Sequence, residues 1–126
     1  MNKISIDVNV KSKLELTEQD INDLMVAALE GGINYWCRKA RIVKMPEGCD
    51  EKIYASDVIS KGGTLELYDA ESTDKWELTL EKFMNGVKFV CERDGYTSGE
   101  DLMDNHDADT ADTIVQYALF NEIVFG

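Results

Sequence analysis

A change of pattern within residues 28–43 constrains the fold of this chain more than any other stretch. Before it, apolar residues recur at helical spacing and share one face of a helix: Ile21, Leu24, Met25, Ala28 and Leu29. Gly31 and Gly32 end this pattern, and we expect one of them to adopt the left-handed conformation of a helix C-terminus. Residues 35–43 then alternate between two faces as in a strand, and long cations lie on both faces. This stretch therefore predicts a helix followed by an edge strand.

Similar patterns predict the other elements of the chain. A strand is predicted over residues 4–10, with a possible extension through Leu14 and Leu16, and a helix begins after Thr17. A short helix over residues 55–61, capped by Gly62 and Gly63, precedes a hairpin of residues 64–68 and 75–79. A helix over residues 80–93, a loop over residues 94–106 and a last helix capped by Asp107 or Asp109 complete the chain. The order β-α-β-α-β-β-α-α lacks the regular alternation of a parallel sheet. It predicts an α+β fold, in which three to four helices pack on a small mixed or antiparallel sheet of about four strands. The sequence has no internal repeat and no low-complexity linker, so we expect residues 1–126 to form one domain.

Asn85 and Gly86 leave two alternatives open within residues 80–93. A glycine inside a helix costs about 1 kcal/mol relative to alanine. Either the helix is unbroken and another element packs closely on Gly86, or it breaks and residues 87–91 form a strand. We favour the unbroken helix.

The charge of the chain narrows the class of partner. With 25 acidic and 13 basic residues, the formal net charge is −12. Such a charge disfavours direct binding to nucleic acid or to an anionic membrane, and it suits a cationic protein surface, including one that normally grips DNA. The three cysteines are widely spaced and odd in number, and no apolar run reaches the length of a membrane span. We therefore expect a cytoplasmic protein without a disulfide framework.

Acidic residues are densest within residues 92–112, which contain eight of them and one arginine. The spacing superficially resembles a calcium loop. However, counting from Asp107, the glycine and glutamate that an EF-hand needs at positions six and twelve are replaced by Asp112 and Ala118. A looser divalent site formed by Asp104, Asp107 and Asp109 remains an alternative to helix capping and solvation, and no cofactor is expected.

The last helix carries a polar face beside its apolar one. In helical projection, Phe120 falls next to Asp109, Asp112 and Gln116 instead of on the core face. Phe89 similarly lies opposite the apolar face of the helix over residues 80–93. Large apolar residues outside the core face often contact partners, so we expect protein binding or self-association here.

A second candidate surface combines aromatic and cationic side chains: Tyr35, Trp36, Arg38 and Arg41. Such a combination can bind a small phosphorylated ligand by stacking and ion pairing. The structural alternative places Trp36 in the core and pairs the cations with strand carboxylates such as Glu66 and Glu77.

Evidence for catalysis is weak. The chain has a single histidine, His106, and none of the sequence motifs of phosphate-binding loops, dinucleotide sites, zinc proteases or serine hydrolases. A pair of His106 with Asp107 or Asp109 is possible, but a histidine on an exposed loop is the simpler interpretation. We therefore expect a protein that is not an enzyme.

Four segments resemble a family of small acidic proteins, without an assigned activity, that are encoded by phages and prophages of Gram-positive gut bacteria. They are ALEGGINYWC (28–37), YASDVISKGGTLELYD (54–69), WELTLEKF (76–83) and DADTADTIVQYALFNEIVFG (107–126). The resemblance implies that the protein is a phage accessory protein, and it assigns no catalytic residue. Small phage accessory proteins frequently block a host process, including bacterial immunity.

These observations lead to one main hypothesis and two alternatives. The main one is a phage-type accessory protein that inhibits a host defence or nucleic-acid-handling protein by stoichiometric binding through an acidic surface, as anti-CRISPR or DNA-mimic proteins do. Its expected partner-binding residues are Asp104, Asp107, Asp109, Asp112, Gln116 and Phe120. The first alternative is an oligomeric sponge for a phosphorylated nucleotide signal, which would use Tyr35, Trp36, Arg38 and Arg41. The second is a structural or interaction protein of another role.

Overall fold

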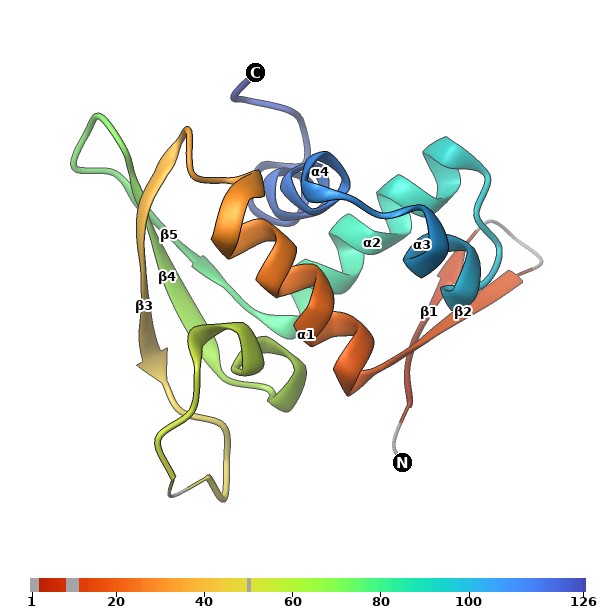
Figure 1. The fold of residues 1–126 in the computed structure, drawn as a ribbon, viewed down its shortest axis with the longest axis horizontal. Helices are drawn as coiled ribbons and strands as arrows, with labels where there is room; N and C mark the ends of the chain where they lie inside the picture. The colour runs from red at the N-terminus through yellow and green to blue at the C-terminus, as the bar shows by residue number, and fades with distance from the viewer. Residues whose placement is uncertain (1–2, 9–11, 50) are drawn as a thin grey trace.

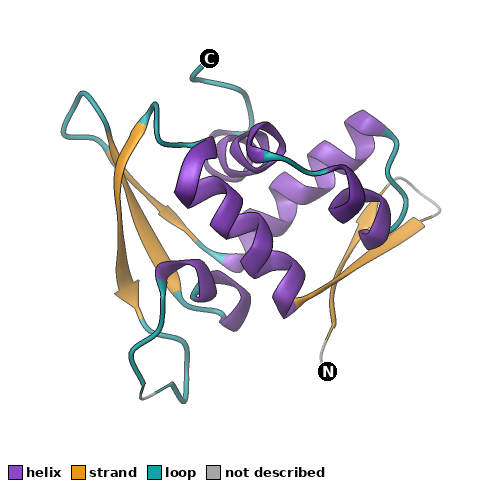
Figure 2. Cartoon of the chain, viewed as in Figure 1, coloured by secondary structure: helices purple, strands orange, loops and turns teal. Residues whose placement is uncertain are grey.

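A layer of helices lies between two small antiparallel sheets in the computed structural model, which describes residues 3–8, 12–49 and 51–126 (Figures 1 and 2). The predicted α+β class is confirmed, but the strands form two sheets instead of one. One sheet pairs β1 (Lys3–Val8) with β2 (Ser12–Thr17), and Ile6 lies opposite Leu14. Leu14 and Leu16 thus belong to a second strand, whereas the predicted residues 9 and 10 lie outside the described residues. Gly or Pro usually indicates a hairpin turn, but the sequence between these strands contains neither. The hairpin was therefore not predicted.

The second sheet contains β3 (Cys37–Lys44), β4 (Thr64–Asp69) and β5 (Lys75–Leu78) in that order. The predictions of an edge strand and of the β4–β5 hairpin are confirmed. Ala40, Leu67 and Trp76 are in register on the face toward the helices. Strand alternation places their neighbours Arg41, Glu66 and Glu77 on the opposite face.

Helix α1 (Glu18–Ala27) begins at Thr17, as predicted, with a capping box formed with Asp20. It continues into one wider turn, η1 (Ala28–Gly32). The prediction of a left-handed glycine here is wrong, since the glycines with positive φ among the described residues are Gly48, Gly62 and Gly95. Gly32 serves close packing instead, because a Cβ atom on it would lie 2.4 Å from the carbonyl oxygen of Ala108.

Two short 3₁₀ turns, η2 (Ala55–Asp57) and η3 (Ile59–Lys61), replace the predicted short helix and end at the left-handed Gly62, with φ of 89°. Helix α2 (Leu80–Asp94) is unbroken, as predicted. A Cβ atom on Gly86 would lie 2.1 Å from the carbonyl oxygen of Ile114, so this glycine permits α2 to approach α4 (Ala108–Phe120) closely.

The predicted loop over residues 94–106 is wrong because it contains a further helix, α3 (Gly99–Asn105). The Ser98 hydroxyl accepts a hydrogen bond from the Asp101 amide and caps this helix. Leu102 is its one fully buried side chain. Seven residues with a single core anchor produce too little periodicity to be read from sequence.

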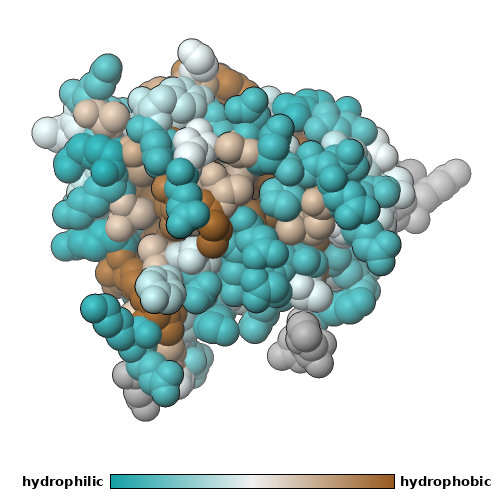
Figure 3. Space-filling view, in the orientation of Figure 1, coloured by the Kyte–Doolittle hydropathy of each residue, from teal (hydrophilic) through white to brown (hydrophobic). Residues whose placement is uncertain are grey.

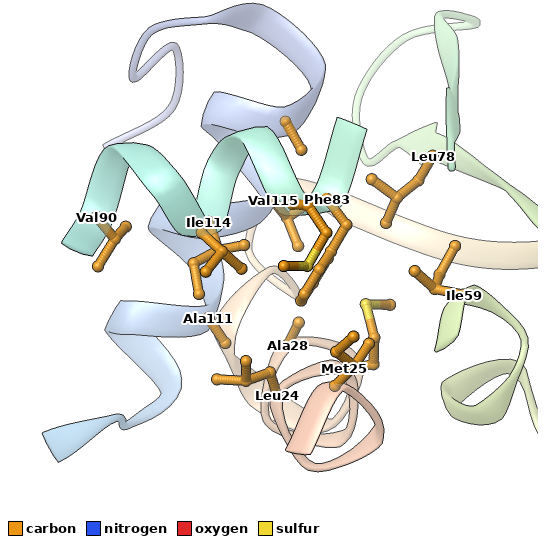
Figure 4. Close-up of a cluster of buried hydrophobic side chains, with 14 of the residues drawn as sticks. Leu24, Met25, Ala28, Ile59, Leu78, Phe83, Val90, Ala111, Ile114 and Val115 are labelled. Carbon is orange, nitrogen blue, oxygen red and sulfur yellow. The ribbon is translucent and has the colours of Figure 1, made fainter. Parts of the chain in front are cut away.

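The core forms where α1, α2 and α4 meet the three-stranded sheet (Figure 4). The side chains labelled there come from all of these elements and from η1 and η3: Leu24, Met25, Ala28, Ile59, Leu78, Phe83, Val90, Ala111, Ile114 and Val115. The same cluster of buried residues includes Val8 and Leu14 of the hairpin. The helices thereby connect the two sheets through continuous apolar packing.

Candidate functional site

Members of both sets of residues expected to bind partners or ligands meet at one place, where the segment before β3 contacts α4. The carboxylate of Asp112 accepts hydrogen bonds from Trp36 Nε1 (2.8 Å), Tyr35 Oη (2.6 Å) and Gln116 Nε2 (2.9 Å). Asp112 is 8% exposed, Trp36 2% and Gln116 0%. The network therefore belongs to the interior, with Tyr35 at its outer edge.

Residues 121–126, called the C-terminal segment below, lie over this network. Asn121 ends α4 with φ of 59°, which turns the chain back. Gln116 Oε1 then accepts hydrogen bonds from the backbone amides of Val124 (2.8 Å) and Phe125 (2.9 Å). The Phe125 carbonyl accepts from Gln116 Nε2 at 3.1 Å and lies 3.2 Å from Tyr35 Oη.

The number of protons on the Tyr35 hydroxyl and on Gln116 Nε2 decides which of these contacts are hydrogen bonds. A phenol has one proton, and the charged carboxylate of Asp112 is its nearest and strongest acceptor. The two protons of Gln116 Nε2 then go to Asp112 and to the Phe125 carbonyl. Gln116 is thereby fully paired although it is buried, which avoids the cost of an unsatisfied polar group.

Four aromatic rings lie beside the network: Trp36, Trp76, Phe120 and Phe125. Phe125 stacks on Trp36 with 4.9 Å between ring centroids and 4° between planes. Trp76 and Phe120 meet edge to face, 5.0 Å apart. The apolar end of the sequence predicts that Ile123 and Phe125 dock on the sheet or on a second subunit. Phe125 does so within the same chain, whereas Ile123 is 45% exposed.

The Tyr35 phenol is perturbed by its surroundings. Burial of the group, together with its hydrogen bond to Asp112 and the negative charge of that carboxylate, raises the pKa of Tyr35 to about 12. Most of the rest of this side chain is solvent-exposed. The phenol is therefore a neutral donor at physiological pH and not a candidate base.

The expected exposed polar face of the last helix is corrected by this geometry. Asp112 and Gln116 are buried, and Phe120 is half-buried against the two tryptophans. The physical reason is that residues 35–36 and 121–126 cover that face and supply its hydrogen-bond partners. Phe89, also expected to be exposed, stacks on Tyr117 with 3.4 Å between ring centroids.

The other expected partner residues, Asp104, Asp107 and Asp109, are exposed. Asp107 is the predicted N-cap of α4 and accepts a hydrogen bond from the Thr110 amide at 2.9 Å. This hydrogen bond lowers the pKa of the Asp107 carboxyl. Within the described part of the chain, no three His, Cys, Asp or Glu side chains are arranged to hold a metal ion, so the looser divalent site is not supported.

Arg38 and Arg41 belong to β3 and make their contacts within the three-stranded sheet. Arg41 pairs with Glu66 at 3.5 Å, as the structural alternative predicted. Arg38 donates to the Asp69 carbonyl at 3.1 Å and lies over the Tyr68 ring. The Tyr68 hydroxyl donates to Glu66, and this bond lowers the pKa of the Glu66 carboxyl. Since Trp36 is buried, it cannot stack on an external base beside these cations.

Two further residues have roles that sequence reasoning placed incompletely. The alternation of Trp76 and Leu78 against Glu77 predicts that they share one face of a strand, and the structure adds that Trp76 contacts the ring of Phe120. His106 is half-buried, and its Nδ1 lies 2.7 Å from the Met103 carbonyl. The histidine therefore contacts the end of α3 instead of pointing freely from a loop.

Comparison of the chain with protein-family models, with curated proteins and with solved structures gives no match. Within the described residues, no helix has the length and apolar character needed to cross a membrane.

Proposed function

We propose that this protein acts by stoichiometric binding through an acidic face. This face consists of the exposed carboxylates of α3 and of the start of α4: Glu100, Asp101, Asp104, Asp107 and Asp109. It replaces the set expected from sequence, from which Asp112, Gln116 and Phe120 are removed by their burial.

The lack of ion pairs to these carboxylates among the residues that the structure describes is the observation that carries the proposal. Residues 95–126 contain no Lys or Arg. Where the structure describes ion pairs, they involve carboxylates elsewhere, on Glu15, Glu18, Glu66 and Asp94. None of these ion pairs neutralises a carboxylate of the acidic face, and the negative potential there attracts a cationic surface.

The surroundings of the face support a polar interface. Figure 3 shows mostly hydrophilic side chains on the side of the molecule that carries α3. A hollow of about 450 Å³ separates α3 from the β1–β2 hairpin, where Lys3 and Lys13 face Glu100 and Asp104. Charged residues of both signs at this margin would orient a partner as well as attract it.

The partner class follows from charge. A protein that handles nucleic acid presents Lys and Arg in the arrangement that neutralises phosphates. The acidic face would compete for such a surface, in keeping with a phage-type protein that inhibits host defence in the cytosol. The nucleotide-sponge alternative is not carried forward, because Trp36 is unavailable for stacking.

A matched pair of charge-reversal variants tests the proposal. Glu100, Asp104 and Asp109 would be changed to lysine together, and Asp107 would be kept because it caps α4. The control changes Glu47, Glu51 and Glu81 to lysine. These are exposed, give the same change in net charge, and include a residue in the first turn of a helix, as Asp109 is.

Each protein would be used to capture partners from a Gram-positive host lysate, with quantitative mass spectrometry. We expect a basic protein to be captured at a stoichiometric level by the wild type and the control. Its recovery should fall at least tenfold with the acidic-face variant, and binding should weaken with salt. Equal capture by the two variants would contradict the proposal.

A further inference from the structure

The C-terminal segment is held in the manner of a bound peptide. The amide of Gln116 exchanges two hydrogen bonds with the backbone of one residue, Phe125, through its amide at 2.9 Å and its carbonyl at 3.1 Å. A neighbouring strand makes the same two contacts with a hydrogen-bonded residue in an antiparallel sheet. Recognition of this kind reads an extended backbone and not a particular side chain.

The slot beside Gln116 selects the side chain. Phe125 stacks on Trp36, while Trp76 and Phe120 present their rings at about 6 Å, with interplanar angles of 64° and 65°. Parallel stacking on one ring and edge contacts with two others favour an aromatic group over an aliphatic one.

The receiving groups lie in the interior, whereas most of the segment that they hold is exposed. Trp36, Asp112 and Gln116 are buried and hydrogen-bonded to one another. In contrast, residues 121–124 and 126 are exposed. If the segment left, Gln116 would lose the partners of its oxygen and of one N–H, and a chain that supplies the same backbone groups would restore them.

We infer that Tyr35, Trp36, Trp76, Gln116 and Phe120 form a peptide-binding site that the chain's own Phe125 occupies. Its external ligand is an extended segment of a partner protein that carries an aromatic residue flanked by basic residues. Binding of that segment displaces the C-terminal segment. This inference does not depend on the acidic face of α3 and α4.

Acidic residues near the slot indicate that basic residues flank the aromatic residue of the ligand. A hollow of about 170 Å³ continues beyond Phe125, and the charged residues that line it are Asp69 and Glu71. A basic residue after the aromatic one fits this rim. A second copy of the chain fits less well, since each copy carries a net charge of −12 and its segment carries Glu122.

Tryptophan fluorescence provides a direct test, because the chain has two tryptophans and both line the slot. The variant Phe125→Ala empties the slot in the full chain. The probe is a peptide of residues 121–126 with lysine in place of Glu122 and Gly126, and the control peptide has alanine in place of its phenylalanine.

We expect the probe to change the emission of Phe125→Ala saturably and to bind it at least tenfold more tightly than the wild type. The wild-type segment competes at a high effective concentration because it is tethered. The control peptide should give no saturable change. A folded Phe125→Ala protein without a response at millimolar probe would overturn the inference.

A second variant, Val124→Pro, removes one backbone donor to Gln116 and leaves Phe125 in place. It should also bind the probe more tightly than the wild type. Unfolding of both variants, judged by circular dichroism, would show that the segment is an integral part of the core and would overturn the inference. So would light scattering that shows the wild type to be a dimer formed by exchange of the segment.

Discussion

At the scale of single residues, Asp112 shows how a polar position becomes part of the interior. Its carboxylate has three side-chain donors, two of which come from residues more than seventy positions earlier in the chain. A buried carboxylate would be costly without them. The same residue on an isolated helix would be read as solvent-exposed, and only the approach of Tyr35 and Trp36 reverses this.

Adjacent glycines provide a matched test of close packing. Gly32→Ala should lower the free energy of unfolding by about 1 to 3 kcal/mol, because the new Cβ atom must push the start of α4 away. In Gly31→Ala the Cβ atom would lie 4.0 Å from the Ala108 Cβ, an ordinary contact, and the substitution should be neutral or stabilise by up to about 1 kcal/mol. Urea denaturation measures both, and equal effects would contradict this account of the η1 turn.

The Tyr35 hydroxyl is predicted to stabilise the fold in a pH-dependent manner. Tyr35→Phe should cost about 1 kcal/mol at pH 7, because Asp112 loses a donor. The folded-state pKa of about 12 exceeds the ordinary value of 10.0, so this stabilisation is complete below pH 10 and is lost as the pH rises toward 12.

Urea denaturation between pH 7 and 11.5 checks this prediction for Tyr35. The difference between wild type and Tyr35→Phe should narrow across the alkaline part of that range. Tyr54→Phe serves as a control, since Tyr54 is 80% exposed. A constant difference at all pH values would show that the phenol contributes through packing alone.

At the scale of elements, the helix ends are set locally, and the contacts between elements are not. Thr17, Thr79, Ser98 and Asp107 each cap a helix through a hydrogen bond to a backbone amide three residues on. The course of the chain after α4 has a different origin. It depends on Gln116, which lies earlier in α4, and on the Trp36 ring, which comes from the turn before β3.

Substitutions at Asp107 and Asp109 compare a carboxylate that caps α4 with one that lies in its first turn. Asp107→Ala should cost about 1 kcal/mol at pH 7, whereas Asp107→Asn should cost little because asparagine caps equally well. Asp109→Ala should have a smaller effect, since Asp109 lies in the first turn and does not form the N-cap, and its carboxylate contributes through the helix dipole.

Thermal unfolding at pH 7 and pH 3 measures these differences for Asp107. The cap lowers the pKa of Asp107, so its contribution is present above the ordinary aspartate pKa of about 3.9 and is lost as the pH falls. The deficit of Asp107→Ala should therefore shrink at pH 3. An equal loss from Asp107→Ala and Asp109→Ala would contradict the capping role.

At the scale of the whole molecule, the helical layer makes one core out of two sheets. Buried residues run without interruption from Val8 in the hairpin to Leu65 and Leu67 in the three-stranded sheet. That residues 1–126 unfold as one domain remains a prediction, and the cysteines can test it. Cys37 belongs to the three-stranded sheet and Cys91 to α2, and both are buried.

Labelling of thiols should report a single opening event. Burial raises the pKa of Cys37 and, together with nearby carboxylates, raises that of Cys91 to about 12, so neither thiol is reactive in the folded state. Cys49 is only half-buried and should react first. In a Cys49→Ser variant, Cys37 and Cys91 should react at one common rate, about a thousandfold or more below that of Cys49 in the wild type.

Rates of labelling at neutral pH, resolved by peptide mass spectrometry, measure this protection. Two clearly different rates for Cys37 and Cys91 would mean that the sheet and the helical layer open separately. In that event the single-domain prediction would be wrong.

Much of the local structure was predictable from the sequence. Period-2 alternation located the β4–β5 hairpin, helical spacing located α1, α2 and α4, and Thr17 and Asp107 were recognised as caps. Gly86 was correctly read as a point of close approach, because an interior glycine in a strongly periodic helix implies such a contact. The short α3 and the division of the strands between two sheets were missed, since neither produces a long periodic signal.

By itself, the sequence determined the α+β class, most element positions and the uncompensated negative charge of residues 95–126, because these depend on residue type and near-neighbour spacing. The tertiary structure alone decided which polar residues are accessible. It separated the exposed Asp104, Asp107 and Asp109 from the buried Asp112 and Gln116, although all five belong to one short stretch. The physical reason is that burial of a polar side chain depends on donors and rings brought from distant parts of the chain, here Tyr35, Trp36 and Phe125.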